Sequence, residues 1–186
     1  MKLDSRDVSL TALFAALYVV VNVIQMFSVG NPLVSGPVQL RIADCLIALA
    51  ALFGLPVVFG VTVGCVVSNV LSNLMYWLGP VDIVLGPLAN FVAAGLVFLL
   101  WRRRLLACIV GALPIGFIVG GYLWLFFDAP EVLAFMPLWL GMIVSITISS
   151  LIAVAVIGYS LLLILSRPEV IEPLKSHGLK ALTERW

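Results

Sequence analysis

The stretch "LRIADCLIALAALFGLP", residues 40–56, decides how many times this chain crosses a membrane. Its apolar part, from Ile42 to Phe53, is shorter than the roughly 17 residues that a full helical crossing needs. The stretch also places Arg41 and Asp44 three residues apart in a chain where charges are scarce. It therefore raises two questions: whether the segment crosses, and what the charged pair does.

The composition indicates whether the chain lies in water or in a membrane. Of 186 residues, 63% are hydrophobic and 10% are charged, and the mean hydropathy is +1.24. Soluble domains carry about 25% charged residues, and apolar runs of about 20 residues recur here, each able to cross a bilayer. The sequence predicts a multi-pass integral membrane protein. A net charge of +1 gives no reason to expect a nucleic-acid partner.

Glycine, proline and charged residues divide the apolar runs. We expect a first span over about 8–27, a loop over 28–40, and a short second segment over 42–53 that Gly54 closes before Pro56 opens the next helix. A third span should reach about residue 78, and further spans should cover about 82–101, 105–127 and 135–165. Residues 1–166 then form one six-helix membrane domain, and residues 167–186 form a short polar cytoplasmic tail.

The distribution of basic residues favours a crossing second segment. Short cytoplasmic loops collect Lys and Arg. If all six segments cross and the N-terminus is inside, nine of the ten basic residues are cytoplasmic, and only Arg41 is outside. If the second segment did not cross, Arg102, Arg103 and Arg104 would face away from Lys2 and Arg6. We therefore predict an all-α bundle of six transmembrane helices with both termini cytoplasmic.

Several polar side chains fall near the outer ends or in the outer halves of the predicted spans, where each is costly unless it has a partner or a function. Arg41 and Asp44 should lie at the outer entrance of the second span. Asn69 and Asn73 are four apart and share a helical face. Asn90 follows Asp82 on the same side, about 12 Å deeper. The candidate solute-binding residues, expected to line one cavity open to the exterior, are Arg41, Asp44, Asn69, Asn73, Asp82, Asn90, Trp77 and Trp139.

The same residues also fit a purely structural role. The asparagines can join helices by hydrogen bonds, and Arg41 with Asp44 can form a local ion pair. The tryptophans can belong to an interfacial aromatic belt. Small residues recur at four-residue intervals, at Ala12 and Ala16 with Ala15 beside them, and at Gly60, Gly64, Ser68 and Ser72. Such faces permit close helix approach, within the protein or against another membrane subunit.

The residues required for several other functions are missing from the sequence. There is no G-x-x-x-x-G-K-[ST] phosphate loop, and no nucleophile with its base lies in the spans. Cys45, Cys65 and Cys108 fall in separate apolar runs and His177 is the only histidine, so no metal site is expected. We predict no catalytic residues and no enzyme activity. An intramembrane acid pair of Asp44 and Asp82 is a weaker alternative.

Four motifs carry a family resemblance that covers about residues 8–165. They are "AALY" at 15–18, "QLRIADCL" at 39–46, "GCVVSNVLSN" at 64–73 and "GPVDIVLGPLANFVAA" at 79–94. With them the chain resembles the QueT family, substrate-binding S components of energy-coupling factor (ECF) transporters proposed to import queuosine precursors.

The resemblance implies an assembly in the plasma membrane. An S component of this kind is a six-helix bundle that joins a transmembrane coupling subunit and two cytoplasmic ATPases. Those partners would use the ATP, and this chain would hold no cofactor. Ala12, Ala15 and Ala16 would form the face toward the coupling subunit.

The implied solute is a 7-deazaguanine such as preQ1 or preQ0. One carboxylate, Asp44 or Asp82, would accept its adjacent N–H donors, and Arg41 with the asparagines would supply the remaining bonds. The other aspartate could pair with the cationic aminomethyl group of preQ1. An S component for another vitamin-like solute, or a structural membrane subunit, remains the alternative.

Overall fold

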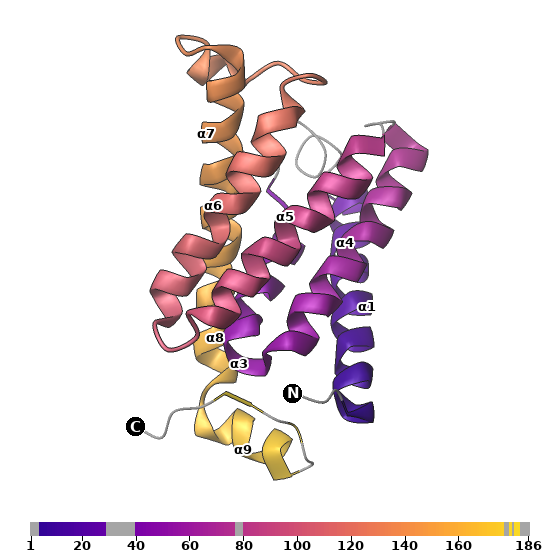
Figure 1. Cartoon of the computed structure of the whole chain (residues 1–186), viewed down its shortest axis with the longest axis vertical. Coiled ribbons are helices and arrows are strands. Elements are labelled where there is room, and N and C mark those ends of the chain that lie inside the picture. The colour runs from indigo at the N-terminus through magenta and orange to yellow at the C-terminus, as the bar shows by residue number, and fades with distance from the viewer. Residues whose placement is uncertain (1–3, 29–39, 77–79, 177–178, 180, 183–186) are drawn as a thin grey trace.

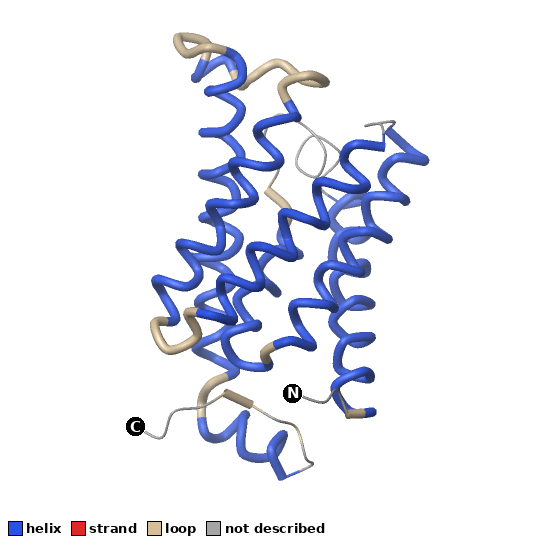
Figure 2. Tube along the Cα trace, in the orientation of Figure 1, coloured by secondary structure: helices blue, strands red, loops and turns tan. Residues whose placement is uncertain are grey.

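Helices make up the regular structure of this chain. The computed structural model describes residues 4–28, 40–76, 80–176, 179 and 181–182, and this part of the chain contains no strand (Figures 1 and 2). The all-helical class predicted from the sequence is confirmed.

Long apolar helices form the outer part of the bundle. Among the described residues, five helical segments are long and apolar enough to cross a membrane. Their ends lie within a few residues of the predicted ones. They are α1 (Ser5–Ser28), α4 (Leu55–Tyr76), α5 (Pro80–Leu99), α6 (Arg104–Leu123), and a continuous helix formed by α7 (Leu138–Ser150), η3 (Leu151–Gly158) and α8 (Tyr159–Leu165).

The short second segment lies inside the bundle. It forms a 3-10 helix, η1 (Ile42–Leu49), followed by one α-helical turn, α3 (Ala50–Phe53), and every residue from Ala43 to Phe53 is buried. The tighter 3-10 winding rises more per residue, so the segment extends about 22 Å where an α-helix would extend about 18 Å. That length is still short of a bilayer core of about 30 Å. The segment is therefore a core helix enclosed by the long spans.

Glycine allows η1 to pack closely against η3, which has π-helical winding. A Cβ added at Gly158 would lie 2.7 Å from the Cys45 carbonyl oxygen and 2.9 Å from Ala48 Cβ. No side chain fits between these backbones without moving one of them. The end of the second segment is marked by Gly54, as predicted, and its φ of 70° suits glycine. Helix α4 begins at Leu55, one residue before the predicted start at Pro56.

The two series of small residues have different environments. Gly60 and Gly64 lie against α1, where an added Cβ would come within 2.7 Å of Phe14 Cβ and Tyr18 Cβ respectively. That series serves packing inside the protein. Ala12 and Ala16 are instead exposed on the surface of α1, and Ala15 is partly buried between the two faces.

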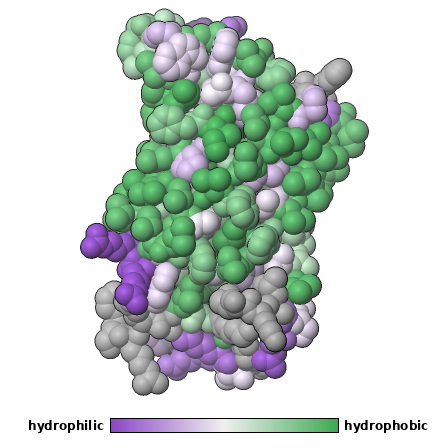
Figure 3. Space-filling model, in the orientation of Figure 1, coloured by the Kyte–Doolittle hydropathy of each residue, from purple (hydrophilic) through white to green (hydrophobic). Residues whose placement is uncertain are grey.

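One end of the molecule is basic. The start of α1, the α5–α6 turn and the C-terminal α9 (Pro168–Ser176) lie at the same end, the lower one in Figure 1. Figure 3 shows a broad hydrophobic band above it. The tail also contacts the bundle, since the Leu182 N–H donates to the Leu52 carbonyl oxygen at 2.7 Å and Ile171 is buried. The described basic residues at this end are Arg6, Arg102, Arg103, Arg104, Arg167 and Lys175.

Candidate functional site

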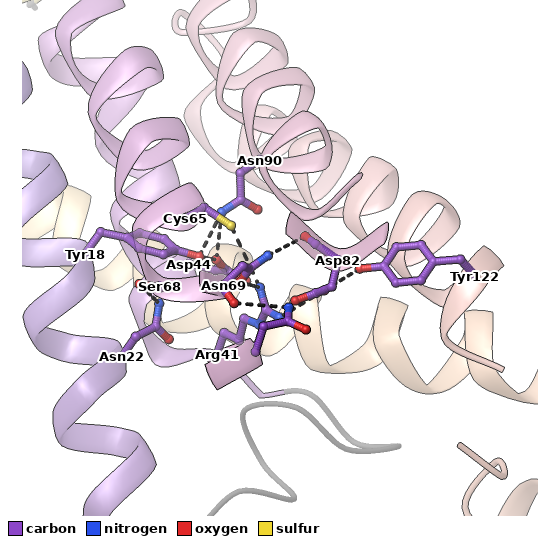
Figure 4. Close-up of polar contacts among 11 residues, drawn as sticks. Tyr18, Asn22, Arg41, Asp44, Cys65, Ser68, Asn69, Asp82, Asn90 and Tyr122 are labelled. Atoms are coloured by element: carbon purple, nitrogen blue, oxygen red, sulfur yellow. Dashed lines mark hydrogen bonds and ion pairs between the residues drawn. The ribbon is translucent and has the colours of Figure 1, made fainter. Parts of the chain in front are cut away.

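A buried polar cluster occupies the centre of the bundle where η1 begins. Tyr18, Asn90 and Tyr122 point toward it from α1, α5 and α6 (Figure 4). Every member is less than a tenth exposed. The buried polar cluster consists of Tyr18, Arg41, Asp44, Cys65, Asn69, Asp82, Asn90 and Tyr122.

Arg41 connects the start of η1 to α4 and α5. Its Nη2 lies 3.5 Å from Asp82 Oδ1, and its Nη1 donates to Asn69 Oδ1 at 3.1 Å. The backbone at Arg41 is extended, with φ −79° and ψ 102°, so the residue caps η1 instead of continuing it. The side chain is only 6% exposed. The expectation of an open entrance at Arg41 is therefore wrong: η1 is enclosed by longer helices, and the guanidinium is buried among them.

Asp82 is in the first turn of α5 and has no solvent exposure. Its Oδ1 accepts a hydrogen bond from the Tyr122 hydroxyl at 2.5 Å, and its backbone carbonyl accepts from Asn69 Nδ2 at 2.7 Å. Its other carboxyl oxygen, Oδ2, is buried and has no hydrogen-bond partner among the described residues. Asp82 thus has one oxygen inside the network and one unused acceptor.

Asp44 forms the second half of the cluster, toward α1. Its Oδ1 accepts from the Tyr18 hydroxyl at 2.6 Å and from Asn90 Nδ2 at 3.3 Å. The Asn90 amide also donates to the Tyr18 oxygen at 2.8 Å. The ion pair of Arg41 in the structure is with Asp82, on another helix. Among the described side-chain contacts, Arg41 bonds to Asn69 and Asp82. Asp44 bonds to Tyr18 and Asn90.

The cluster carries more acid than base. It contains one guanidinium and two carboxyl groups, so its formal charge sums to −1. Burying these groups is tolerable because each carboxyl accepts tyrosine or amide donors and one of them pairs with Arg41. Such a set can bind a ligand that offers N–H donors or a positive charge. In the described part of the chain, no group of three or more His, Cys, Asp or Glu side chains is placed to hold a metal ion.

The structure brings together most of the residues that the sequence singled out. Arg41, Asp44, Asn69, Asp82 and Asn90 belong to one buried cluster, and Asp82 and Asn90 lie on the inner side of α5 as their spacing predicts.

The remaining candidates lie at the edge of this cluster or outside it. Asn73 is partly buried and donates only to the Asn69 backbone oxygen, at 3.2 Å, among the bonds described for it. Trp139 is half exposed on the second residue of α7, outside the cluster. Trp77 lies outside the described residues.

Sequence reasoning missed the hydroxyl bonds of Tyr18 and Tyr122 to the aspartates and the amides of the first span. Gln25 Nε2 donates to the Leu40 carbonyl oxygen at 2.5 Å, and its Oε1 accepts from the Ile42 N–H at 2.9 Å, which fastens the start of η1 to α1. Asn22 Nδ2 donates to Ser68 Oγ at 3.4 Å, and its Oδ1 is buried without a partner in the described structure. Asn22 and Gln25 are polar within a span and could have been found by the cost argument. Tyr18 and Tyr122 gave no such signal, since buried aromatics are common.

Comparison with known proteins identifies a transporter family. The family model described as QueT transporter matches residues 8–167. The chain is 33% identical over 102 residues to the queuosine precursor transporter QueT of Lactococcus lactis subsp. cremoris (strain MG1363). That alignment covers 55% of this chain and 55% of the relative, so the similarity spans about half of the relative's length. No solved structure gives a significant match.

The family match extends over all five long spans and the enclosed second segment. It therefore includes every member of the buried polar cluster. Its description is that of a membrane transporter and not of an enzyme. The chain belongs to the QueT transporter family.

Proposed function

We propose that this chain is the substrate-binding S component of an ECF-type importer and that it binds a 7-deazaguanine queuosine precursor, preQ1 or preQ0, from outside the cell. The observation that carries the site assignment is the unpaired Asp82 Oδ2, a buried carboxyl oxygen within a network that is otherwise hydrogen-bonded. The L. lactis relative is named as a queuosine precursor transporter, which supports the solute class.

An unused buried acceptor is an energetic cost that a ligand can remove. Leaving such a group unsatisfied costs about 1–3 kcal/mol, and more when it is charged. A 7-deazaguanine presents adjacent N–H donors on its guanine-like edge, which a carboxylate accepts well. Asp82 Oδ2 is the acceptor that we assign to this edge. The assignment gives Asp82 priority over Asp44, whose Oδ1 already accepts from Tyr18 and Asn90.

The surplus carboxyl favours a cationic solute. The cluster's formal charge of −1 would be neutralised by the aminomethyl ammonium group of preQ1, whereas the nitrile of preQ0 carries no charge. A charge buried without compensation is costly. We therefore expect preQ1 to bind more tightly than preQ0.

Solute entry requires the cluster to exchange partners. Arg41 bonds Asn69 and Asp82, so a solute at Asp82 must share or replace those bonds. Specificity would follow from this exchange, because an analogue lacking the matching donors would leave the buried groups unpaired.

The proposed orientation in the membrane rests on the distribution of basic residues. We count the enclosed short segment as a sixth pass of the chain through the bundle, although it is shorter than the bilayer core. The basic end of the molecule and both chain termini then lie on the cytoplasmic side, in accordance with the positive-inside rule. The chain has no nucleotide-binding motif, so ATP would act at two cytoplasmic ATPases joined through a coupling subunit. The chain itself would bind solute without a cofactor.

Calorimetric titration of the purified chain with preQ1 and preQ0, in the absence of ATP, tests the proposal. We expect saturable binding that is tighter for preQ1, and a loss of at least about tenfold in Asp82→Asn. Asp128→Asn, which changes an exposed acid between α6 and α7, is the matched control and should bind normally. Failure of either solute to bind would contradict the solute class, whereas unchanged binding in Asp82→Asn would contradict the site.

A further inference from the structure

A cavity lies at the basic end of the molecule, at the α5–α6 turn. It measures about 340 Å³ and is lined by Trp101, Arg102, Arg103, Arg104, Leu105, Leu106, Tyr159 and Leu163. None of these residues belongs to the buried polar cluster. In Figure 3 the hydrophilic atoms at the lower left mark this turn, beside the lower edge of the hydrophobic band.

The polar wall of the cavity is cationic. Three consecutive arginines line it, and the first of the three holds its guanidinium 5.6 Å from the centre of the Trp101 ring. The arginines lead into α6, which starts at Arg104, so the backbone N–H groups of its first turn add to the positive field. Among the described residues, those that line this cavity include no acidic side chain. Three guanidinium groups on one wall favour an anionic ligand.

The rest of the wall is apolar and opens toward the lipid-facing surface. Leu105, Leu106 and Leu163 are each between 42% and 48% exposed, which places apolar surface next to the arginines. Trp101 and Tyr159 complete the lining as amphipathic aromatics of the kind found at membrane interfaces. A soluble anion would use only the cationic half of this cavity, whereas a phospholipid would use both.

We infer that this cavity is a binding site for an anionic phospholipid, with the phosphate headgroup on Arg102, Arg103 and Arg104 and an acyl chain along Leu105, Leu106 and Leu163. Basic pockets between transmembrane helices recognise anionic headgroups in this way, because guanidinium groups pair with phosphate oxygens at the membrane surface. The site is independent of the solute and of the proposed transport function. It would fix the α5–α6 turn against one leaflet.

Native mass spectrometry of the full-length protein in detergent tests the site directly. With the wild-type chain, phosphatidylglycerol should be retained in a 1:1 complex and phosphatidylcholine of the same acyl chains should not. Equal retention of the two lipids overturns the proposal without any variant. Full displacement by soluble glycerophosphoglycerol overturns it as well, because the site would then bind a free anion.

Matched variants distinguish lipid binding in the cavity from lipid binding to basic residues elsewhere on the surface. Arg103→Gln together with Arg104→Gln should lower phosphatidylglycerol affinity about 30-fold, since each basic residue near a membrane contributes roughly fivefold. Arg167→Gln, an exposed arginine at the same end that does not line the cavity, should leave it unchanged. Leu163→Trp keeps every charge but fills the cavity, and should also release the lipid.

Two results in the variants would overturn the assignment. Unchanged phosphatidylglycerol retention in the double arginine variant would show that the headgroup does not lie on these arginines. Unchanged retention in Leu163→Trp would show that no acyl chain occupies the cavity. Normal thermal unfolding and normal solute binding in each variant show that the fold is intact.

Discussion

Arg41 is a buried cation whose partners lie on other helices. It is the only basic residue in the buried polar cluster, and it contacts Asp82 and Asn69 from other helices. Separating such a pair is more costly than removing both members, because the remaining charge stays buried without compensation. The pair therefore orders the start of η1 in the chain without solute.

A double-mutant cycle measures this pairing. Arg41→Met should lower the free energy of unfolding by about 3–5 kcal/mol, because it leaves the Asp82 carboxyl buried without its cation. Adding Asp82→Leu should restore much of that loss. Chemical unfolding in detergent, followed by tryptophan fluorescence, gives the four stabilities. Simple additivity of the two single changes would contradict the pairing.

The two tyrosine hydroxyls distinguish the two aspartates. Tyr122→Phe removes the donor to Asp82, and Tyr18→Phe removes the donor to Asp44. Each change should cost about 1.5–3 kcal/mol of stability, as expected for a hydrogen bond to a charged group. Only Tyr122→Phe should change preQ1 affinity strongly if Asp82 holds the solute.

Tyr159→Phe, a tyrosine outside the cluster, is the control for this pair. Solute binding should be normal in that variant. A larger effect of Tyr18→Phe than of Tyr122→Phe on preQ1 affinity would indicate that the solute binds to the carboxylate of Asp44 and not to that of Asp82.

Among the elements, α5 shows how backbone proximity positions a polar side chain. The Asn69 side chain lies directly against Gly86, and a Cβ at Gly86 would overlap its Nδ2. This allows Asn69 to reach the Asp82 carbonyl oxygen at 2.7 Å. The hydrogen bond from Asn69 on α4 to Asp82 on α5 therefore requires a residue without a side chain at position 86.

Two glycine substitutions on α5 test this condition. Gly86→Ala should displace Asn69, break its bonds to Asp82 and Arg41, and weaken preQ1 binding by about tenfold. Gly95→Ala on the same helix has no atom within 4 Å of the new Cβ, and should be neutral or stabilising by up to about 1 kcal/mol. Binding titration and thermal unfolding compare the two variants. Equal effects of the two would show that helix propensity, and not the contact with Asn69, is responsible.

At the scale of the whole molecule, one small-residue face packs inside the protein and the other lies on its surface. Gly60 and Gly64 bring α4 into backbone contact with α1, while Ala12 and Ala16 remain exposed on the surface of α1. An exposed small-residue face on a membrane helix permits close approach by another helix. This is the face that we propose for the coupling subunit.

Bulky substitutions on the two faces should therefore behave differently. Ala12→Leu with Ala16→Leu should leave thermal unfolding and solute binding unchanged but abolish co-purification with the coupling subunit. Gly64→Leu should instead destabilise the chain itself, because the added side chain has no room against Tyr18. Normal assembly of the double alanine variant would contradict the proposed contact face.

The long apolar helices and their approximate limits could be predicted from sequence, because each depends on local chemistry, whereas α9 in the polar tail was not predicted. Apolar length identified the spans, and Gly54 with Pro56 marked the junction of the second and third segments. The cost of polar groups in lipid singled out Arg41, Asp44, Asn69, Asp82 and Asn90 before any contact was known. That Ile42–Phe53 is too short for an ordinary crossing was also visible in the sequence.

Only the tertiary structure decided which of these groups meet. Tyr18 and Asn90 lie 26 and 46 residues from Asp44, and Tyr122 lies 40 residues from Asp82, so no local pattern links them. Burial of η1 by the surrounding spans turned an expected outer entrance into an enclosed cluster. Sequence by itself determined which residues are too polar for lipid, because that cost belongs to each side chain. Which polar groups satisfy one another, and which oxygen of Asp82 is left for a ligand, depends on helix packing.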